Sequence, residues 1–167
     1  MFIASSLDGF IARDDGSFDW LFTDQDYGYK QFYDSVDTVI MGRKTYDIAL
    51  RFDDNPYKEK MVYVFTRRTP TVQKNPNVEF ISEAVSFTEN LINRMGEDIW
   101  LVGGSEIISE LFNSRLIHEM VLSVHPRVLG KGIPLFKNIL RSDTKLELAK
   151  TDQYDSGLVQ LRYKLIN

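Results

Sequence analysis

The sequence predicts an α/β protein with a central mixed, mostly parallel sheet, helices on both faces and an antiparallel C-terminal hairpin. Through residue 113, short β-branched and apolar runs alternate with segments of helical periodicity. This alternation is typical of parallel strands joined by crossover helices. From residue 117 onward the pattern is all β, and turn-forming residues at 155–157 separate two strands.

Length and composition indicate a single domain over residues 1–167. Hydrophobic residues make up 43% of the chain and charged residues 26%, which is ordinary for a globular protein. The net charge of −4 argues against general nucleic-acid binding, which usually requires a basic face. The chain has no cysteine, no start typical of a signal peptide and no apolar run of the ~20 residues that span a bilayer. We therefore expect a cytoplasmic protein.

The first half of the chain alternates short strands with two helices. Each strand is a β-branched or aromatic run beside turn-forming residues. The first helix is predicted because apolar side chains recur three and four positions apart, at Tyr29, Phe32, Tyr33 and Val36. In order, we expect a strand over 2–5, turns at 7–9 and 14–17, a helix around 29–36, a strand over 38–41, a helix from 44 to about 52 that residues 53–56 stop, and strands over 61–66 and 78–81.

The second half begins with a helix and ends in strands. Ser86 and Glu89 have the spacing of a capping box, which predicts a helix that begins there and ends at Gly96. In order, we expect that helix, a strand over 99–102, a helix over 106–113, and strands over 120–125, 145–151 and 158–165, the last two joined by the turn at 155–157.

One glycine turn leads from the strand at 99–102 directly into a helix. Gly103 and Gly104 allow a ligand to approach the backbone, and the hydroxyl of Ser105 can contact a phosphate. A simple strand-to-helix turn with a serine cap explains the same residues equally well. Glu106 would repel a phosphate, so we expect its carboxylate to point sideways.

A second turn, Gly42-Arg43-Lys44-Thr45, places two cations at a helix start. Cations are unfavourable there because the N-terminal end of the helix dipole is positive. A bound anion would explain them, with Thr66 and Arg67 as further partners, whereas a solvated basic turn is the alternative. Two separated phosphate sites suit a dinucleotide with an extra phosphate, such as NADPH.

The other polar and aromatic residues give weaker signals. His118 and His125 form no spaced set with carboxylates, so we expect no metal site. Residues 6–12 suit either a flap over a flat ring or an ordinary turn. The aromatic residues after that segment either line a substrate pocket or belong to the core; the candidates for the pocket are Trp20, Tyr29 and Phe32.

Taken together, these motifs resemble those of the dihydrofolate reductase superfamily. Met-Gly-Arg-Lys-Thr-Tyr at 41–46 is similar to its Met-Gly-Arg-(His or Lys)-Thr-Trp, and Val-Gly-Gly-Ser-Glu-Ile at 102–107 to its Ile-Gly-Gly-Gly-x-(Val or Ile). Ser-Leu-Asp-Gly-Phe-Ile-Ala at 6–12 and Leu-Gly-Lys-Gly-Ile-Pro-Leu-Phe at 129–136 resemble the reductase domain of riboflavin biosynthesis more than folate reductases. The resemblance covers nearly the whole chain and implies a dihydrofolate reductase-like fold.

The resemblance also implies roles for individual residues. The backbone at Ala4 would hold the nicotinamide carboxamide, Asp8 and Gly9 would form the flap, and the Gly103–Gly104 peptide bond would be cis. The adenosine side would lie on the first glycine turn and the pyrophosphate on the second. The residues expected to bind NADPH are Ala4, Asp8, Gly9, Gly42, Arg43, Lys44, Thr45, Thr66, Arg67, Val102, Gly103, Gly104, Ser105, Glu106 and Ile107.

By resemblance, we expect an NADPH-dependent reductase that transfers hydride to a flat heterocyclic or carbonyl substrate, as 5-amino-6-(5-phosphoribosylamino)uracil reductase does. Folate reductases bind the folate carboxylate with an arginine where this chain has Lys58-Glu59-Lys60. Asp26 is the loose counterpart of their proton-donating carboxylate. A folate reductase with altered tail recognition and a non-catalytic nucleotide-binding protein are the alternatives. The expected partners are a small-molecule substrate and a second copy in a homodimer, without nucleic acid or membrane.

Overall fold

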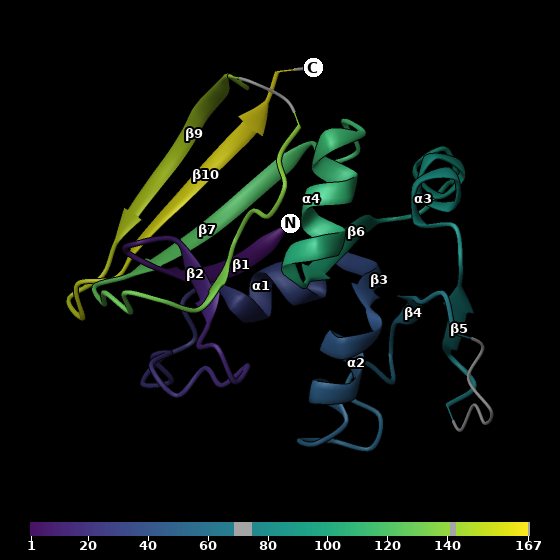
Figure 1. Ribbon diagram of the computed structural model, residues 1–167, viewed down its shortest axis with the longest axis horizontal. Coiled ribbons are helices and arrows are strands. Elements are labelled where there is room, and N and C mark those ends of the chain that lie inside the picture. The colour runs from purple at the N-terminus through teal and green to yellow at the C-terminus, as the bar shows by residue number, and fades with distance from the viewer. Residues whose placement is uncertain (69–74, 141–142, 167) are drawn as a thin grey trace.

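The computed structural model describes residues 1–68, 75–140 and 143–166, which form two four-stranded sheets, a small two-stranded pair and helices packed against them (Figure 1). The predicted α/β class with a mixed, mostly parallel arrangement is confirmed. The elements in chain order are β1 (Phe2–Ser6), β2 (Phe10–Ala12), α1 (Tyr29–Asp34), β3 (Val36–Gly42), α2 (Arg43–Ala49), β4 (Met61–Phe65), β5 (Val78–Ile81), α3 (Ala84–Ile92), β6 (Asp98–Gly103), α4 (Ser105–Asn113), β7 (Glu119–His125), β8 (Ile133–Pro134), β9 (Leu146–Gln153) and β10 (Val159–Leu165).

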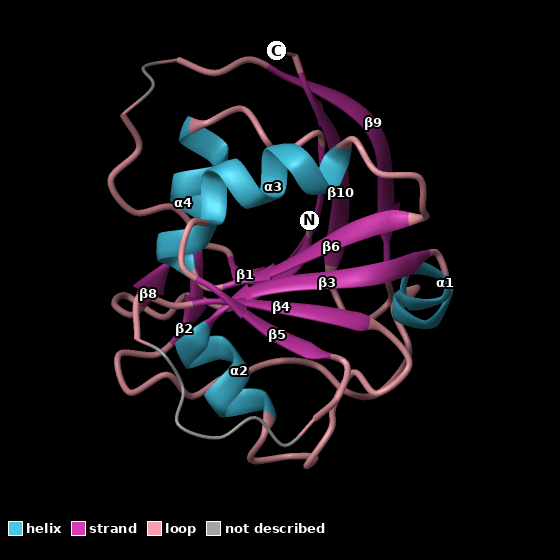
Figure 2. Cartoon of the chain, turned by 90° about the vertical axis from the view of Figure 1, so that its right-hand side faces the viewer, coloured by secondary structure: helices cyan, strands magenta, loops and turns pink. Residues whose placement is uncertain are grey.

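The first sheet has the order β5-β4-β3-β6 and is parallel throughout. Its strands are apolar on both faces because helices cover both (Figure 2). Ile40 points to the side of α3 and α4, where it packs in one cluster with Ile108. Val39 and Met41 point to the opposite side and pack in another cluster with Tyr46 of α2. The two-residue alternation of β3 therefore divides the core into two layers.

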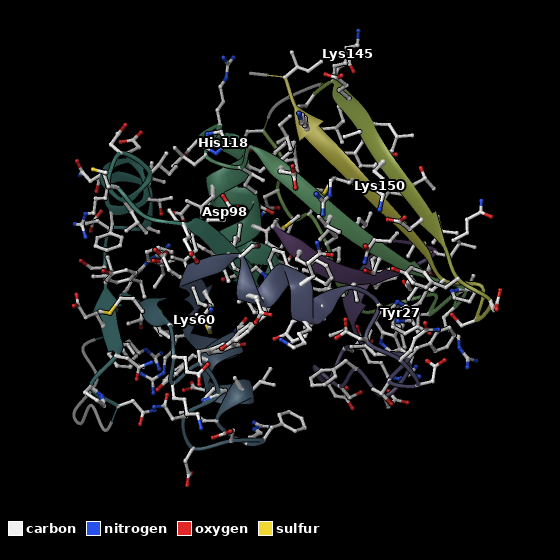
Figure 3. The ribbon with its side chains drawn as sticks, turned by 180° about the vertical axis from the view of Figure 1, so that it is seen from behind. Tyr27, Lys60, Asp98, His118, Lys145 and Lys150 are labelled. Carbon is white, nitrogen blue, oxygen red and sulfur yellow. The ribbon has the colours of Figure 1, made fainter. Side chains whose placement is uncertain are left out.

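The second sheet has the order β1-β7-β10-β9. β1 runs parallel to β7, and β10 is antiparallel to both of its neighbours. The predicted C-terminal hairpin is β9 and β10, and their pairing shifts register between Arg162 and Tyr163. β9 is an edge strand, and most of its residues are exposed. Its side chains, including Lys150, extend away from the core (Figure 3).

The predicted central sheet is divided where β1 meets β6. At this seam the indole Nε1 of Trp100 donates a 3.1 Å hydrogen bond to the Phe2 carbonyl oxygen, so that a side chain takes the place of a strand amide. The aromatic side chains of α1 cover the seam. Phe32 stacks on the Phe2 ring at 4.5 Å and meets the Trp100 ring edge-on at 5.3 Å. β1 is paired with β7 along its full length, which confirms the strand predicted over residues 2–5 and extends it to Ser6.

Four of the predicted helix boundaries are wrong, and one of these is the end of α2, which lies at Ala49 and not near residue 52. Helix α1 ends at Asp34, and the fully buried Val36 begins β3. The boundary was misplaced because Val36 continues the apolar spacing of the helix, although its side chain is buried as part of the strand. The capping box at Ser86 and Glu89 is also wrong, because α3 begins at Ala84 and both residues lie inside it.

Gly96 does not end α3, which stops at Ile92. A β-carbon on Gly96 would lie 2.9 Å from Oδ2 of Asp37, and this oxygen accepts a hydrogen bond from the Glu97 amide. The glycine therefore permits a close approach to the start of β3.

The short strands β2 and β8 were not predicted, since neither is long enough to show a period. The Gly103–Gly104 peptide bond is cis, as expected. In the part of the chain that the structure describes, no helix has the length and apolar character needed to cross a membrane.

Candidate functional site

The two glycine turns meet at one edge of the parallel sheet. β3 ends at Gly42 and β6 at Gly103, and because the strands are parallel their carboxyl ends lie together. A β-carbon built on Gly42 would lie 3.8 Å from the Gly103 carbonyl oxygen and 3.8 Å from Cγ2 of Ile107. On Gly104 it would lie 3.4 Å from Oγ1 of Thr45. The structure thus brings both predicted turns into one site.

Ser105 opens helix α4 at this edge, and its side chain has no hydrogen-bond partner among the described residues. The N-cap residue is Gly104, so the serine does not cap the helix as the simpler alternative required. The side chain is only 5% exposed, and an unpaired buried hydroxyl is unfavourable. This orphaned donor beside the helix N-terminus fits the pyrophosphate of a dinucleotide.

Glu106, the next residue, does not compete for this position. Its carboxylate lies 3.4 Å from the Lys137 ammonium group and is largely exposed, so it points sideways as expected. The preceding residues on β6 place Val102 and Gly103 at the same sheet edge.

The basic residues of the other turn lie at the start of α2. The Arg43 guanidinium pairs with the Asp47 carboxylate at 2.7 Å and lies 5.3 Å from the centre of the Phe80 ring. The Asp47 carboxylate lies one helical turn after Arg43, and the ion pair offsets part of the free-energy cost of a cation at the helix start. Lys44 is exposed.

Thr66 and Arg67 follow β4, which pairs with β3 such that Phe65 lies opposite Gly42. Thr66 therefore follows β4 at the sheet edge where α2 begins, and its role in an anion site stays a prediction. The Thr66 hydroxyl accepts a 3.1 Å hydrogen bond from the Arg68 amide, and Arg67 is exposed.

The predicted flap is fixed at its base by Asp8. Its carboxylate accepts hydrogen bonds from the Ser6 hydroxyl (2.6 Å) and from the amides of Leu129 and Gly130, the latter at 2.7 Å. The Ser6 hydroxyl bond and these amides lower the pKa of Asp8 to about 2. Gly9 adopts a positive φ of 83°, which lets the chain turn back into β2. Ala4 precedes the flap on β1, opposite Ser123.

A pocket of about 350 Å³ adjoins the glycine turns. Thr45 belongs both to the pocket wall and to the neighbourhood of Gly104, so the two share a boundary. The pocket is lined by Phe18, Tyr29, Thr45, Ile48, Ala49, Phe52, Pro56 and Tyr57.

Of the predicted substrate-binding residues, Tyr29 lines this pocket, whereas Trp20 and Phe32 do not. Trp20 is buried with its ring edge-on to His125, and Phe32 belongs to the aromatic cover of the seam. Asp26 is exposed, and its carboxylate accepts a 3.0 Å hydrogen bond from the Lys30 amide at the start of α1. A role for Asp26 in proton transfer stays a prediction.

Most of the residues that line the pocket were not predicted from the sequence, although the spacing of some of them indicates a common helical face. Residues 45, 48, 49 and 52 follow the i, i+3, i+4, i+7 spacing of one helical face. Phe52 lies just beyond the end of α2. Four further lining residues come from more distant loops or another helix, and no period connects them with α2: Phe18, Tyr29, Pro56 and Tyr57.

A family model described as the RibD C-terminal domain matches residues 1–160. The uncharacterized protein YwjB of Bacillus subtilis (strain 168) is 44% identical over 168 residues, which cover 98% of this chain and 95% of that protein. The uncharacterized protein YyaP of the same organism is 32% identical over 173 residues, covering 96% and 91%.

Solved structures show the same fold. A Shewanella sp. PV-4 protein, assigned by its name to riboflavin biosynthesis, superposes with a TM-score of 0.86 at 31% identity, covering 99% of this chain and 97% of its own. The Thermotoga maritima diaminohydroxyphosphoribosylaminopyrimidine deaminase/5-amino-6-(5-phosphoribosylamino)uracil reductase superposes with a TM-score of 0.75 at 19% identity. The match covers 99% of this chain and 55% of that longer protein.

Proposed function

Because the chain belongs to the RibD C-terminal domain family, we propose that it is an NADPH-dependent reductase that transfers hydride to a flat heterocyclic or carbonyl substrate. The observation that carries the proposal is the buried, unpartnered Ser105 hydroxyl at the N-terminus of α4, next to the Gly42 and Gly104 backbone. A solved structure with the same fold is named as a uracil reductase, which is consistent with this proposal.

The residues present fit NADPH at both ends. Ser105 and the free amides at the start of α4 would donate to the pyrophosphate. Arg43, Lys44 and Thr66 would surround the 2′-phosphate at the neighbouring strand ends, where Arg43 is already held by Asp47. Ala4 on β1 would meet the nicotinamide carboxamide.

The bound cofactor supplies the hydride, and the chain supplies orientation and exclusion of water. The pocket beside Thr45 would hold the substrate so that its electrophilic C=N or C=O carbon faces the sheet edge. A proton must reach the other atom of that double bond, from water or from Asp26. Two alternatives use the same site: a folate reductase with altered tail recognition, and a nucleotide-binding protein without catalysis.

The proposal is tested by equilibrium binding of NADPH to the parent protein, to Ser105→Ala and to Ser86→Ala. Ser86 is an exposed serine inside helix α3, so it serves as the matched control. A hydrogen bond to a charged group is worth ~1.5–3 kcal/mol, so loss of the Ser105 hydroxyl should weaken binding about tenfold to a hundredfold. Equal affinities for all three proteins would contradict the assignment of this site.

Turnover is measured as NADPH oxidation with a panel of carbonyl and heterocyclic compounds that includes dihydrofolate and 5-amino-6-(5-phosphoribosylamino)uracil. Oxidation with dihydrofolate alone would support the folate alternative. Clear NADPH binding without oxidation across the panel would favour the non-catalytic alternative.

A further inference from the structure

The pocket beside Thr45 has an uncharged wall. None of the eight residues that line it carries a charge, within the part of the chain that the structure describes. Four of them are aromatic, namely Phe18, Tyr29, Phe52 and Tyr57. We propose that this pocket takes a flat, uncharged aromatic ring that carries no phosphate, which rests on the proposed function and narrows its substrate class.

The aromatic residues supply surfaces for stacking. The rings of Phe18 and Phe52 lie 5.6 Å apart at an interplanar angle of 44°, so they form one corner of the pocket rather than closing it. Phe52 is 73% exposed, so its ring presents apolar surface to solvent at the wall of the pocket. A bound ring that stacks on Phe52 would remove this apolar surface from water.

The polar groups of the pocket are three hydroxyls, those of Thr45, Tyr29 and Tyr57. Burial raises the pKa of both Tyr29 and Tyr57 to about 12, so both phenols are neutral at physiological pH. Neither phenol hydroxyl has a hydrogen-bond partner among the described residues. They are therefore free to bond ring nitrogens or carbonyl oxygens, and they cannot neutralise a phosphate.

The cationic residues nearest in sequence to those that line the pocket either bind other groups or lie outside the pocket. Lys30, next to Tyr29, pairs with Asp34 at 2.7 Å. The Lys60 ammonium group donates to the Val36 carbonyl oxygen at 2.6 Å and faces the Tyr33 ring, at the amino end of β3 (Figure 3). Lys44, Arg51 and Lys58, which adjoin Thr45, Phe52 and Tyr57 in the sequence, are exposed and do not line the pocket. A phosphate in the pocket would lose water without gaining an ionic partner.

The experiment compares three fluorescent probes that share a flat ring: lumichrome, riboflavin and FMN. Riboflavin and FMN differ only by a phosphate. Dissociation constants are measured by fluorescence titration of the parent protein at fixed ionic strength without NADPH. We expect lumichrome and riboflavin to bind, and FMN to bind more weakly than riboflavin because its phosphate would lose water. FMN binding as tightly as riboflavin or tighter would overturn the proposal, because a cation such as Lys44, Arg51 or Lys58 would then hold the phosphate.

Substitutions at Phe52 test whether the probes bind in this pocket. Because the Phe52 side chain is exposed, we expect these substitutions to leave the fold intact. Phe52→Ala should weaken lumichrome binding about tenfold, since stacking on one aromatic side chain is worth ~1–3 kcal/mol. Phe52→Lys should shift the preference toward FMN. Met95, which is fully exposed on another surface, gives the matched controls Met95→Ala and Met95→Lys, and these should change nothing. Unchanged lumichrome binding in Phe52→Ala would overturn the proposal.

The two proposals fail separately. Ring binding that depends on Phe52, without any NADPH binding, would contradict the proposed function alone. NADPH binding that depends on Ser105, without ring binding at Phe52, would contradict the pocket assignment alone.

Discussion

The Thr45 hydroxyl oxygen lies 3.4 Å from the point where a β-carbon on Gly104 would sit. One threonine therefore belongs to the wall of the uncharged pocket and also touches the turn between β6 and α4. A side chain at Gly104 would occupy the boundary between these two regions. The pocket and the glycine turns are therefore adjoining parts of one site.

Arg43→Ala should weaken NADPH binding about tenfold to a hundredfold, because charge-assisted hydrogen bonds to the 2′-phosphate are worth ~1.5–3 kcal/mol. NADH lacks this phosphate, so its affinity should change little. The measurement is the affinity for both cofactors at fixed ionic strength. Asp47→Ala is the control, since it removes the partner of Arg43 and keeps the cation. Equal weakening toward both cofactors would mean that Arg43 has a structural role.

Asp8→Asn should reduce the loss of stability that occurs in acid. The folded-state pKa of Asp8 is about 2, below its ordinary 3.8, because the Ser6 hydroxyl and two amides bind its charged form. The resulting stabilisation is present above pH 3.8 and is lost as the pH falls toward 2. The melting temperature of the parent should therefore fall more steeply than that of the variant over this interval. Parallel curves for the two proteins would contradict the role of Asp8.

Gly132→Ala should destabilise the protein by ~2 kcal/mol or more in urea unfolding. Gly132 has a φ of 156°, and a β-carbon there would collide with the Ala12 carbonyl oxygen, so β2 and β8 would have to separate. Gly130→Ala is the control: its φ is also positive, at 73°, but the space around it is open. It should cost only the ~1–2 kcal/mol of backbone strain. A milder effect at Gly132 than at Gly130 would contradict the packing of this pair of strands.

Trp100→Phe should destabilise the protein more than Trp20→Phe, by ~1 kcal/mol. Both tryptophans are buried, at 6% and 5% exposure. The Trp100 indole donates across the seam to Phe2, whereas the Trp20 indole has no partner among the described residues. Free energies of unfolding from urea titration make the comparison. Equal losses would show that the hydrogen bond at the seam contributes nothing to stability.

Much of the fold could be predicted from the sequence because the buried parallel strands are short and apolar, and two of the four end at a glycine. Gly42 and Gly103 mark the strand ends that form the proposed cofactor side of the candidate site. The division of the sheet could not be predicted, since it depends on one indole, that of Trp100, bonding a carbonyl 98 residues away.

The proposed substrate side was harder to predict than the proposed cofactor side. Tyr57 and Phe18 belong to loops, and their positions depend on how those loops fold over α2. Trp20 and Phe32 have the aromatic character of pocket residues, yet packing against His125 and Phe2 places them outside the pocket. Aromatic residues serve both purposes, so composition alone does not separate a core from a binding surface.

The exposed strand β9 bears on how this protein avoids uncontrolled self-association. An edge strand presents unpaired backbone groups that another chain can extend into a continuous sheet. Here the register shift opposite Arg162 and Tyr163 interrupts the regular ladder, and Glu147, Lys150 and Asp152 put charge along the edge. Bulges and charged side chains are the features with which natural proteins discourage such extension. We therefore expect the predicted homodimer to form through another surface, with β9 left as a solvated border that protects the protein from fibrous aggregation.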